Sequence, residues 1–271
     1  MKRVLKSPEP LALTNYRDAV PNGTWDDMRN DTQWGGQHSY QVARAQAIND
    51  QGGLCAFCEI DIRDNDPLKC RVEHFHPKSD LNRPPNWALE WRNMLGVCNG
   101  GSHRYVTAPG FLLEPMAKNL SCDAHKDQQI QSGALSNACE GWILNPLEIH
   151  AFQCLFKVKK SDGSLAPDPA ACLAAEPWPN NRHATAADLV QHTIDMLNLN
   201  CDRLKKSRLV LVWDIEKNKK RQQAQGFEAP QGMVNLVNRY FSRTWPGFFT
   251  VIRICLGQPA ETHLRATNYQ G

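Results

Sequence analysis

The sequence predicts an α+β protein in which short strands and a cysteine-rich segment lie within a mainly helical chain. In the last third of the chain, apolar residues recur at helical spacing, as in Met233, Leu236, Val237, Tyr240 and Phe241. From Phe152 to Val158, aromatic or apolar residues occupy every second position, and Asp162-Gly163 follows, which is typical of a β-hairpin. Cys55 and Cys58 stand three positions apart, a spacing at which two thiolates can bind one zinc ion.

Turn-forming residues and one apolar helix face predict the structure of the N-terminal region. The first forty residues are rich in Pro, Asn, Asp and Gly, which predicts irregular structure with one short helix near Trp25 to Met28. A helix is predicted from Ser39 to about Asp50, because one face carries the apolar residues Val42, Ala45 and Ile48. Gly52-Gly53 would end this helix with a left-handed cap.

Farther along, the sequence alternates between short extended pieces and helices. Residues 142–146 predict a short strand and turn, and the Ala- and Pro-rich residues 164–183 predict a loop. Asn200 is the expected N-cap of a helix whose apolar side carries Leu204, Leu211, Val212 and Ile215. Lys217 to Arg221 form the basic end of this helix and are expected to be solvated.

The composition is that of a globular protein rather than a membrane protein. The chain has 271 residues, of which 41% are hydrophobic and 22% are charged, and it contains no apolar run as long as a membrane span. No apolar stretch follows the basic residues near Met1, so no secretory signal is predicted, and we expect a cytoplasmic protein with mostly reduced cysteines. A net charge of +3 is too small to indicate nucleic-acid binding by itself.

The cysteines predict one structural zinc site. Cys55 and Cys58 follow a helix that ends in glycine and precede an Asp-rich segment, which favours zinc over a thioredoxin-type redox pair. Cys98 and Cys122 are expected to supply the other two ligands, with the residues between them forming an insertion. Cys70 and the remaining five cysteines are interpreted as small core residues.

Glu73 and His74 are the residue types that hydrolysis of a phosphodiester bond requires. Hydrolysis of a phosphodiester needs a base that activates water and a cation that stabilises the developing charge. A histidine that binds no metal can be that base, and an adjacent carboxylate can hold Mg²⁺. Without the cysteines nearby, an exposed strand edge would be the simpler interpretation of this pair.

Four segments in order resemble the HNH endonuclease pattern: Cys55-Ala56-Phe57-Cys58, Val72-Glu73-His74-Phe75-His76-Pro77-Lys78, Asn93 to Cys98, and Cys122-Asp123-Ala124-His125-Lys126. The resemblance implies a ββα-metal (His-Me finger) core with a zinc knuckle. The Glu-His-Phe sequence, the two glycines after Cys98 and segments 143–146 and 193–200 resemble PtuB-type effectors of Septu and retron anti-phage systems.

The resemblance also implies roles for single residues. His74 would be the general base, Asn93 would orient it, and Glu73 and Asp123 would bind the catalytic Mg²⁺ or Mn²⁺, with His125 as the alternative to Asp123. Cys55, Cys58, Cys98 and Cys122 would bind the structural Zn²⁺.

The roles of other polar and aromatic residues near these motifs are inferred from their residue types and positions. Lys78 and Lys126 are candidates for phosphate contacts. His76 is expected to be an exposed bystander, and His103 is a weaker candidate for lining the site. Trp87 and Trp91 are expected in the core.

We therefore expect an N-terminal extension and lead-in helix at 1–50, an HNH nuclease module at 51–145 and a mainly helical region for partner docking at 146–271. The expected substrate is nucleic acid, with DNA favoured because this chemistry requires no 2′-hydroxyl. The resemblance implies a PtuA-type ATPase partner and, in retron versions, a reverse transcriptase with its reverse-transcribed DNA; no membrane is expected. The alternatives are an effector that cleaves RNA, tRNA included, and a zinc-stabilised binding module without catalysis.

Overall fold

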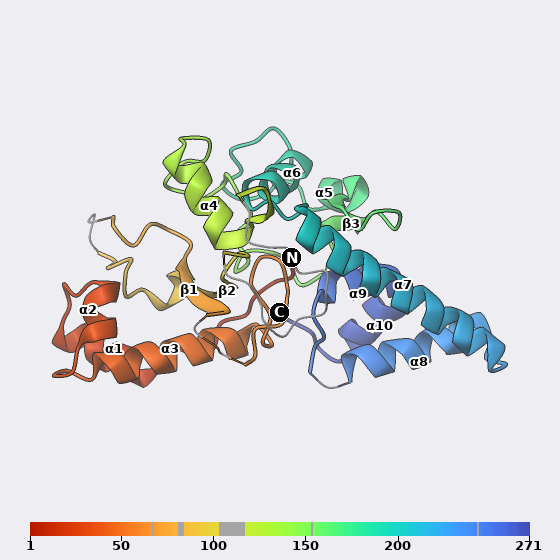
Figure 1. The fold of residues 1–271 in the computed structure, drawn as a ribbon, viewed down its shortest axis with the longest axis horizontal. Coiled ribbons are helices and arrows are strands. Elements are labelled where there is room, and N and C mark those ends of the chain that lie inside the picture. The colour runs from red at the N-terminus through yellow and green to blue at the C-terminus, as the bar shows by residue number, and fades with distance from the viewer. Residues whose placement is uncertain (65, 67, 81–83, 103–116, 153, 243) are drawn as a thin grey trace.

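The computed structural model describes the whole chain except residues 65, 67, 81–83, 103–116, 153 and 243, and it mixes helices with two small sheets (Figure 1). The described helices are α1 (Leu11–Ala19), α2 (Trp25–Asn30), α3 (Gly36–Asp50), α4 (Cys122–Gln131), α5 (Pro169–Ala174), α6 (Ala186–Met196), α7 (Asp202–Ala224), α8 (Ala229–Phe241), α9 (Phe249–Leu256) and α10 (Gln258–Ala266). The strands are β1 (Cys70–His74), β2 (Met94–Cys98), β3 (Phe156–Val158) and β4 (Leu165–Pro167).

The three N-terminal helices pack against one another beside the first sheet (Figure 1). Helix α2 begins with a reciprocal capping box between Thr24 and Asp27, which confirms the predicted short helix. Helix α1 was not predicted. Gly52 and Gly53 follow α3 with φ of 69° and 76°, so the predicted left-handed end of that helix is confirmed.

Strands β1 and β2 form an antiparallel ribbon that carries Glu73 and His74. Cys70 is opposite Cys98 and His74 is opposite Met94 in the register. All five residues of β2 are buried, between α3 and α4. Helix α3 lies so close that a Cβ at Gly96 would stand 2.9 Å from Cγ1 of Ile48. Glycine at this position therefore lets the helix pack directly on the ribbon.

The second sheet confirms the predicted hairpin, with Phe156 opposite Pro167. Three predictions in this half of the chain are wrong. Residues 164–183 are not only a loop, because they contain β4 and α5, and Asp168 caps α5 by accepting hydrogen bonds from two backbone amides. Residues 142–146 form no strand, only an isolated bridge between Glu140 and Ile143. Cys201 rather than Asn200 precedes α7.

A single large hydrophobic core joins the cysteine-rich segment to the C-terminal helices. It runs from Cys55 and Phe57 through α6 and α7 to Phe249 in α9, while a smaller cluster fills the space between α1, α2 and α3. Because one core spans these elements, the packing that supports the cysteines includes the C-terminal half. Among the described residues, no helix is both long and apolar enough to cross a membrane.

Candidate functional site

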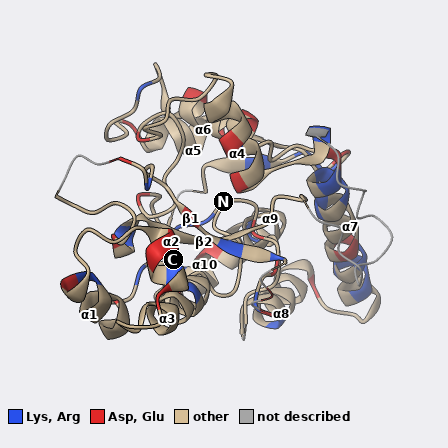
Figure 2. Cartoon of the chain, turned by 60° about the vertical axis from the view of Figure 1, so that its left-hand side comes forward, with Lys and Arg blue, Asp and Glu red and all other residues tan. Residues whose placement is uncertain are grey.

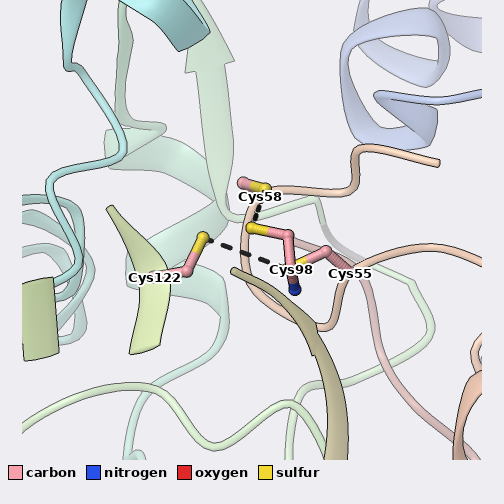
Figure 3. A group of neighbouring side chains, drawn as sticks. All are labelled: Cys55, Cys58, Cys98 and Cys122. Carbon is pink, nitrogen blue, oxygen red and sulfur yellow. Dashed lines mark hydrogen bonds between the residues drawn. The ribbon is translucent and has the colours of Figure 1, made fainter. Parts of the chain in front are cut away.

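Four cysteine side chains converge in the interior, as Figure 3 shows. The Sγ atoms of Cys55, Cys58, Cys98 and Cys122 all lie within 4.8 Å of one another, and all four residues are buried. Cys55 and Cys122 are 3.9 Å apart between sulfurs, and Cys58 and Cys98 are 3.7 Å apart. Tetrahedral zinc with bonds of about 2.3 Å places its sulfur ligands about 3.8 Å apart. The cluster therefore has the donors and the spacing that a zinc ion requires.

Backbone and side-chain groups around the cluster compensate its negative charge. The amides of Cys98 and Gly100 donate to the sulfurs of Cys55 and Cys98, at 3.3 and 3.4 Å. Arg203 at the start of α7 is buried beside the cluster, and its guanidinium donates to Oγ of Ser121 at 2.7 Å. Burial alone would lower the pKa of Arg203, but the nearby cysteines raise it. The guanidinium of Arg203 therefore lies where it would offset part of the negative charge of zinc-bound thiolates.

His74 ends β1 as a buried, neutral imidazole. Its Nε2 lies 3.1 Å from the carbonyl oxygen of Ala88, and its ring meets that of Trp25 edge-on at 4.8 Å between centroids. Burial lowers the pKa of His74 to about 4, against the opposing effect of Glu73. Because a carbonyl only accepts, Nε2 carries the proton, and Nδ1 keeps a lone pair. Among the described residues, none bonds to Nδ1.

Glu73 and Asp123 form a buried carboxyl pair at the junction of β1 and α4. Burial and the charge of Glu73 raise the pKa of Asp123 well above its usual range. Burial opposes ionisation of Glu73 as well, but Lys126 and a hydrogen bond from Asp123 hold the pKa of Glu73 below its ordinary value. The ammonium of Lys126 contacts Oε1 of Glu73 directly, and Nε of Arg71 lies 2.8 Å from Asp123. The two carboxyl groups thus place hard oxygen donors, of the kind that divalent cations prefer, side by side in the interior.

Asn93 and His76 fix the chain that leaves β1. The side chain of Asn93 accepts from the backbone amide of His76 at 2.6 Å and donates to the carbonyls of His76 and Trp87, each at 2.9 Å. The ring of His76 lies 2.7 Å from Glu140 and 3.0 Å from Asp80, and it stacks on Trp87 at 4.0 Å. The prediction that His76 is exposed is thus wrong, because Asn93, Glu140, Asp80 and Trp87 surround it. That it takes no part in catalysis stays a prediction.

A cavity of about 320 Å³ brings together five of the residues that the sequence predicts for catalysis, cation binding and phosphate contact. Its lining includes Glu73, His74, Lys78, Asp123 and Lys126. Of these, Lys126 is buried and has Glu73 as a partner within the protein, which the sequence did not predict. The predicted roles of these residues in catalysis and binding stay predictions.

Other residues that the sequence analysis singled out lie outside this lining. His125, the alternative to Asp123, turns its ring toward the carbonyl of Met196 at 3.0 Å. Trp91 is buried, as predicted, whereas Trp87, predicted in the core as well, is only partly buried. His103 lies outside the described residues.

Asp127 is a site residue that the sequence reasoning missed. It lines the same cavity, and burial together with the charge of Glu73 raises its pKa. It stands four positions after Asp123 in α4, so the two carboxylates share one helix face. That i, i+4 spacing was the available signal.

Comparison with known proteins places these observations in a family. The chain is 36% identical over 217 residues to the protein named "Retron Ec83 putative HNH endonuclease" from Escherichia coli, and the match covers 79% of this chain and 80% of that protein. No protein-family model matches the chain. The extent of the match and the cysteine cluster agree with the resemblance seen in the motifs. The chain belongs to the HNH endonuclease family and is a nuclease, a hydrolase of nucleic acids.

Proposed function

We propose that this nuclease is a metal-dependent endonuclease built on a ββα-metal core, in which β1, β2 and α4 hold the catalytic groups. The observation that carries the proposal is the neutral His74 beside the carboxyl pair of Glu73 and Asp123. A nuclease of this kind needs a base and a site for a hard cation within one cavity. The presence of all three residues in the lining of one cavity supports this proposal.

His74 is proposed to be the general base through Nδ1. The bond from Nε2–H to the Ala88 carbonyl fixes the tautomer and the orientation of the ring. Since the pKa of His74 is lowered to about 4, the imidazole is neutral at physiological pH and ready to accept a proton from water. Asn93 is proposed to be a positioning residue, because it fastens the segment that follows His74.

Glu73 and Asp123 are proposed to hold Mg²⁺ or Mn²⁺, with Asp127 as a further oxygen ligand. When bound, the cation supplies stabilisation of negative charge on the phosphate and the leaving oxygen. Lys126 keeps Glu73 ionised, while Lys78 is left to contact phosphate at the cavity. The four cysteines are proposed to bind a structural Zn²⁺ that fixes β2 relative to α4.

The biological setting is proposed from the family. The retron relative supports a role as an effector of anti-phage defence. From the PtuB resemblance, a PtuA-type ATPase is the proposed partner, joined in a retron by a reverse transcriptase and its reverse-transcribed DNA. DNA is the favoured substrate, and RNA, tRNA included, is the alternative.

The test compares His74→Ala with His38→Ala, which removes an exposed histidine on α3. Purified proteins are incubated with plasmid DNA and with total RNA, each with Mg²⁺ or Mn²⁺ and with or without the cognate ATPase. We expect His74→Ala to lose activity by about 100-fold or more, while His38→Ala cleaves like wild type. Full activity of His74→Ala would contradict the assignment of the base, and the cleaved polymer identifies the substrate.

A further inference from the structure

We propose that one face of α7 binds a single strand of nucleic acid, apart from the cavity that holds His74. This basic–aromatic face consists of Lys206, Val210, Trp213, Lys217, Lys220 and Arg221. It belongs to the half of the chain outside the proposed catalytic core. The proposal concerns binding and does not depend on which residue is the catalytic base.

The six residues lie along one side of a regular helix. Successive members are separated by four, three, four, three and one positions, which keeps them within an arc of about 100°. From Lys206 to Arg221 the face is roughly 22 Å long, from a rise of about 1.5 Å per residue. It is therefore a continuous stripe and not a set of scattered side chains.

The stripe is exposed at its centre and charged at both ends. Trp213 is 60% exposed and Val210 is 43% exposed, whereas Leu204, Val212 and Ile215 on the other side of α7 are buried. Figure 2 shows Lys and Arg bands on both the upper and the lower part of the helix. Trp213 and Val210 thus expose apolar surface side by side between the cations.

The positively charged side chains of the stripe differ from neighbouring lysines on the same helix in their ion pairing. Lys205 pairs with Asp202, and Lys219 pairs with Glu216. Within the described part of the chain, Lys206, Lys217, Lys220 and Arg221 form no ion pair, and all four are exposed. Four unpaired positive charges on one face call for an anionic partner.

The helix that carries the stripe is held rigidly at its first two turns. Arg203 is tied to Ser121 beside the cysteine cluster, and Arg208 donates to the carbonyls of Gly163 and Leu199 at 2.7 and 2.6 Å. Both arginines are buried. The exposed face is therefore presented in a fixed orientation, which lowers the entropy cost of binding.

A single strand matches both features of the stripe. Its phosphates complement the cations, and its unpaired bases offer flat faces on which an indole stacks. A duplex supplies phosphates but keeps its bases stacked inside. An acidic protein surface would match the cations, but it would not require the indole to be exposed between them.

The experiment measures binding by fluorescence anisotropy with the full-length chain, without added Mg²⁺ or Mn²⁺, so that the probe stays intact. The probes are a 20-nucleotide DNA strand, the RNA strand of the same sequence, the DNA duplex and polyglutamate, over a series of salt concentrations. The test variants are Trp213→Ala and the triple variant Lys217→Gln, Lys220→Gln, Arg221→Gln. The matched controls are Trp34→Ala, at an indole 56% exposed, and the triple variant Arg29→Gln, Lys118→Gln, Lys159→Gln at exposed positions elsewhere.

We expect Trp213→Ala to weaken strand binding roughly 5- to 150-fold, from the loss of one stacked base. The triple variant should reduce the slope of log K against log salt by about 2, since three phosphate contacts are lost. Both controls should bind the strand like the parent protein. The proposal is overturned if the test variants also bind like the parent. It is equally overturned if polyglutamate binds as tightly as the strand and Trp213→Ala changes neither, because the face would then fit an acidic protein.

Discussion

Replacing Asn93 with alanine removes three hydrogen bonds from a residue that is 3% exposed. Each net contribution is about 0.5–1.5 kcal/mol, so we expect the free energy of unfolding to fall by about 3 kcal/mol. The same bonds hold the chain at His76, two residues after the proposed base His74, and at Trp87, next to the Ala88 whose carbonyl His74 contacts. Since a misplacement of about 1 Å can slow an enzyme about 100-fold, we expect kcat to fall by about that factor with KM little changed.

Two measurements on one protein sample test this reasoning about Asn93. Urea unfolding gives the change in stability, and single-turnover cleavage at saturating substrate gives the change in rate. Asn30→Ala, at an exposed position that ends α2, is the control and should change neither. If Asn93→Ala unfolds within about 0.5 kcal/mol of wild type and cleaves at the wild-type rate, the hydrogen bonds do not position the base.

Further predictions concern the base, the cysteines and the buried lysine. Because the pKa of His74 is lowered to about 4, the neutral base persists as pH falls, and cleavage at pH 5.5 with saturating Mn²⁺ should stay within about twofold of that at pH 7.5; a loss of about tenfold would indicate an ordinary histidine pKa. Cys58→Ala should lose bound zinc, measured by mass spectrometry, while Cys154→Ala, outside the cluster, should retain it; equal zinc in both would contradict the site. Lys126→Met should lower the free energy of unfolding by about 3 kcal/mol, since it strands the buried Glu73, and added Mn²⁺ should restore part of that loss. No effect of Mn²⁺ on this variant would argue against a cation beside Glu73.

The cysteine cluster could be predicted partly from local spacing and partly from the order of the motifs along the chain. Cys55-x-x-Cys58 is readable from spacing, and the order of the motifs pointed to Cys98 and Cys122. Family patterns preserve such residues in order even when the separation between them varies, so the long interval before Cys122 did not hide it. The structure then brings all four sulfurs together.

The roles of His76 and Lys126 were harder to predict because their partners come from distant segments. Glu140, which contacts His76, lies 64 positions away, and no local pattern connects the two. Glu73 likewise meets Lys126 only through the packing of α4 on the ribbon. Sequence reasoning identifies the types of residue in a site, whereas tertiary packing decides which charges are paired.

The errors in secondary structure had a different origin. Asp168-Pro169 is a standard helix start, with a capping carboxylate followed by proline, and it was available in the sequence. The Ala- and Pro-rich composition of 164–183 obscured this short signal. Asn200 is a good N-cap by residue type, but tertiary contacts use it elsewhere, since its side chain bonds to Leu165 and Arg208.

The ends of the interval between Cys98 and Cys122 are fastened to each other. The amide of Ser121 donates to the carbonyl of Gly100 at 2.9 Å, and a Cβ at Gly100 would stand 2.3 Å from the carbonyl oxygen of Ser121. Since the two ends already meet beside the sulfurs, the length of chain between them has little influence on the cluster. The arrangement of the four sulfurs is therefore expected to depend on this local closure between Gly100 and Ser121 and only weakly on how many residues separate Cys98 from Cys122.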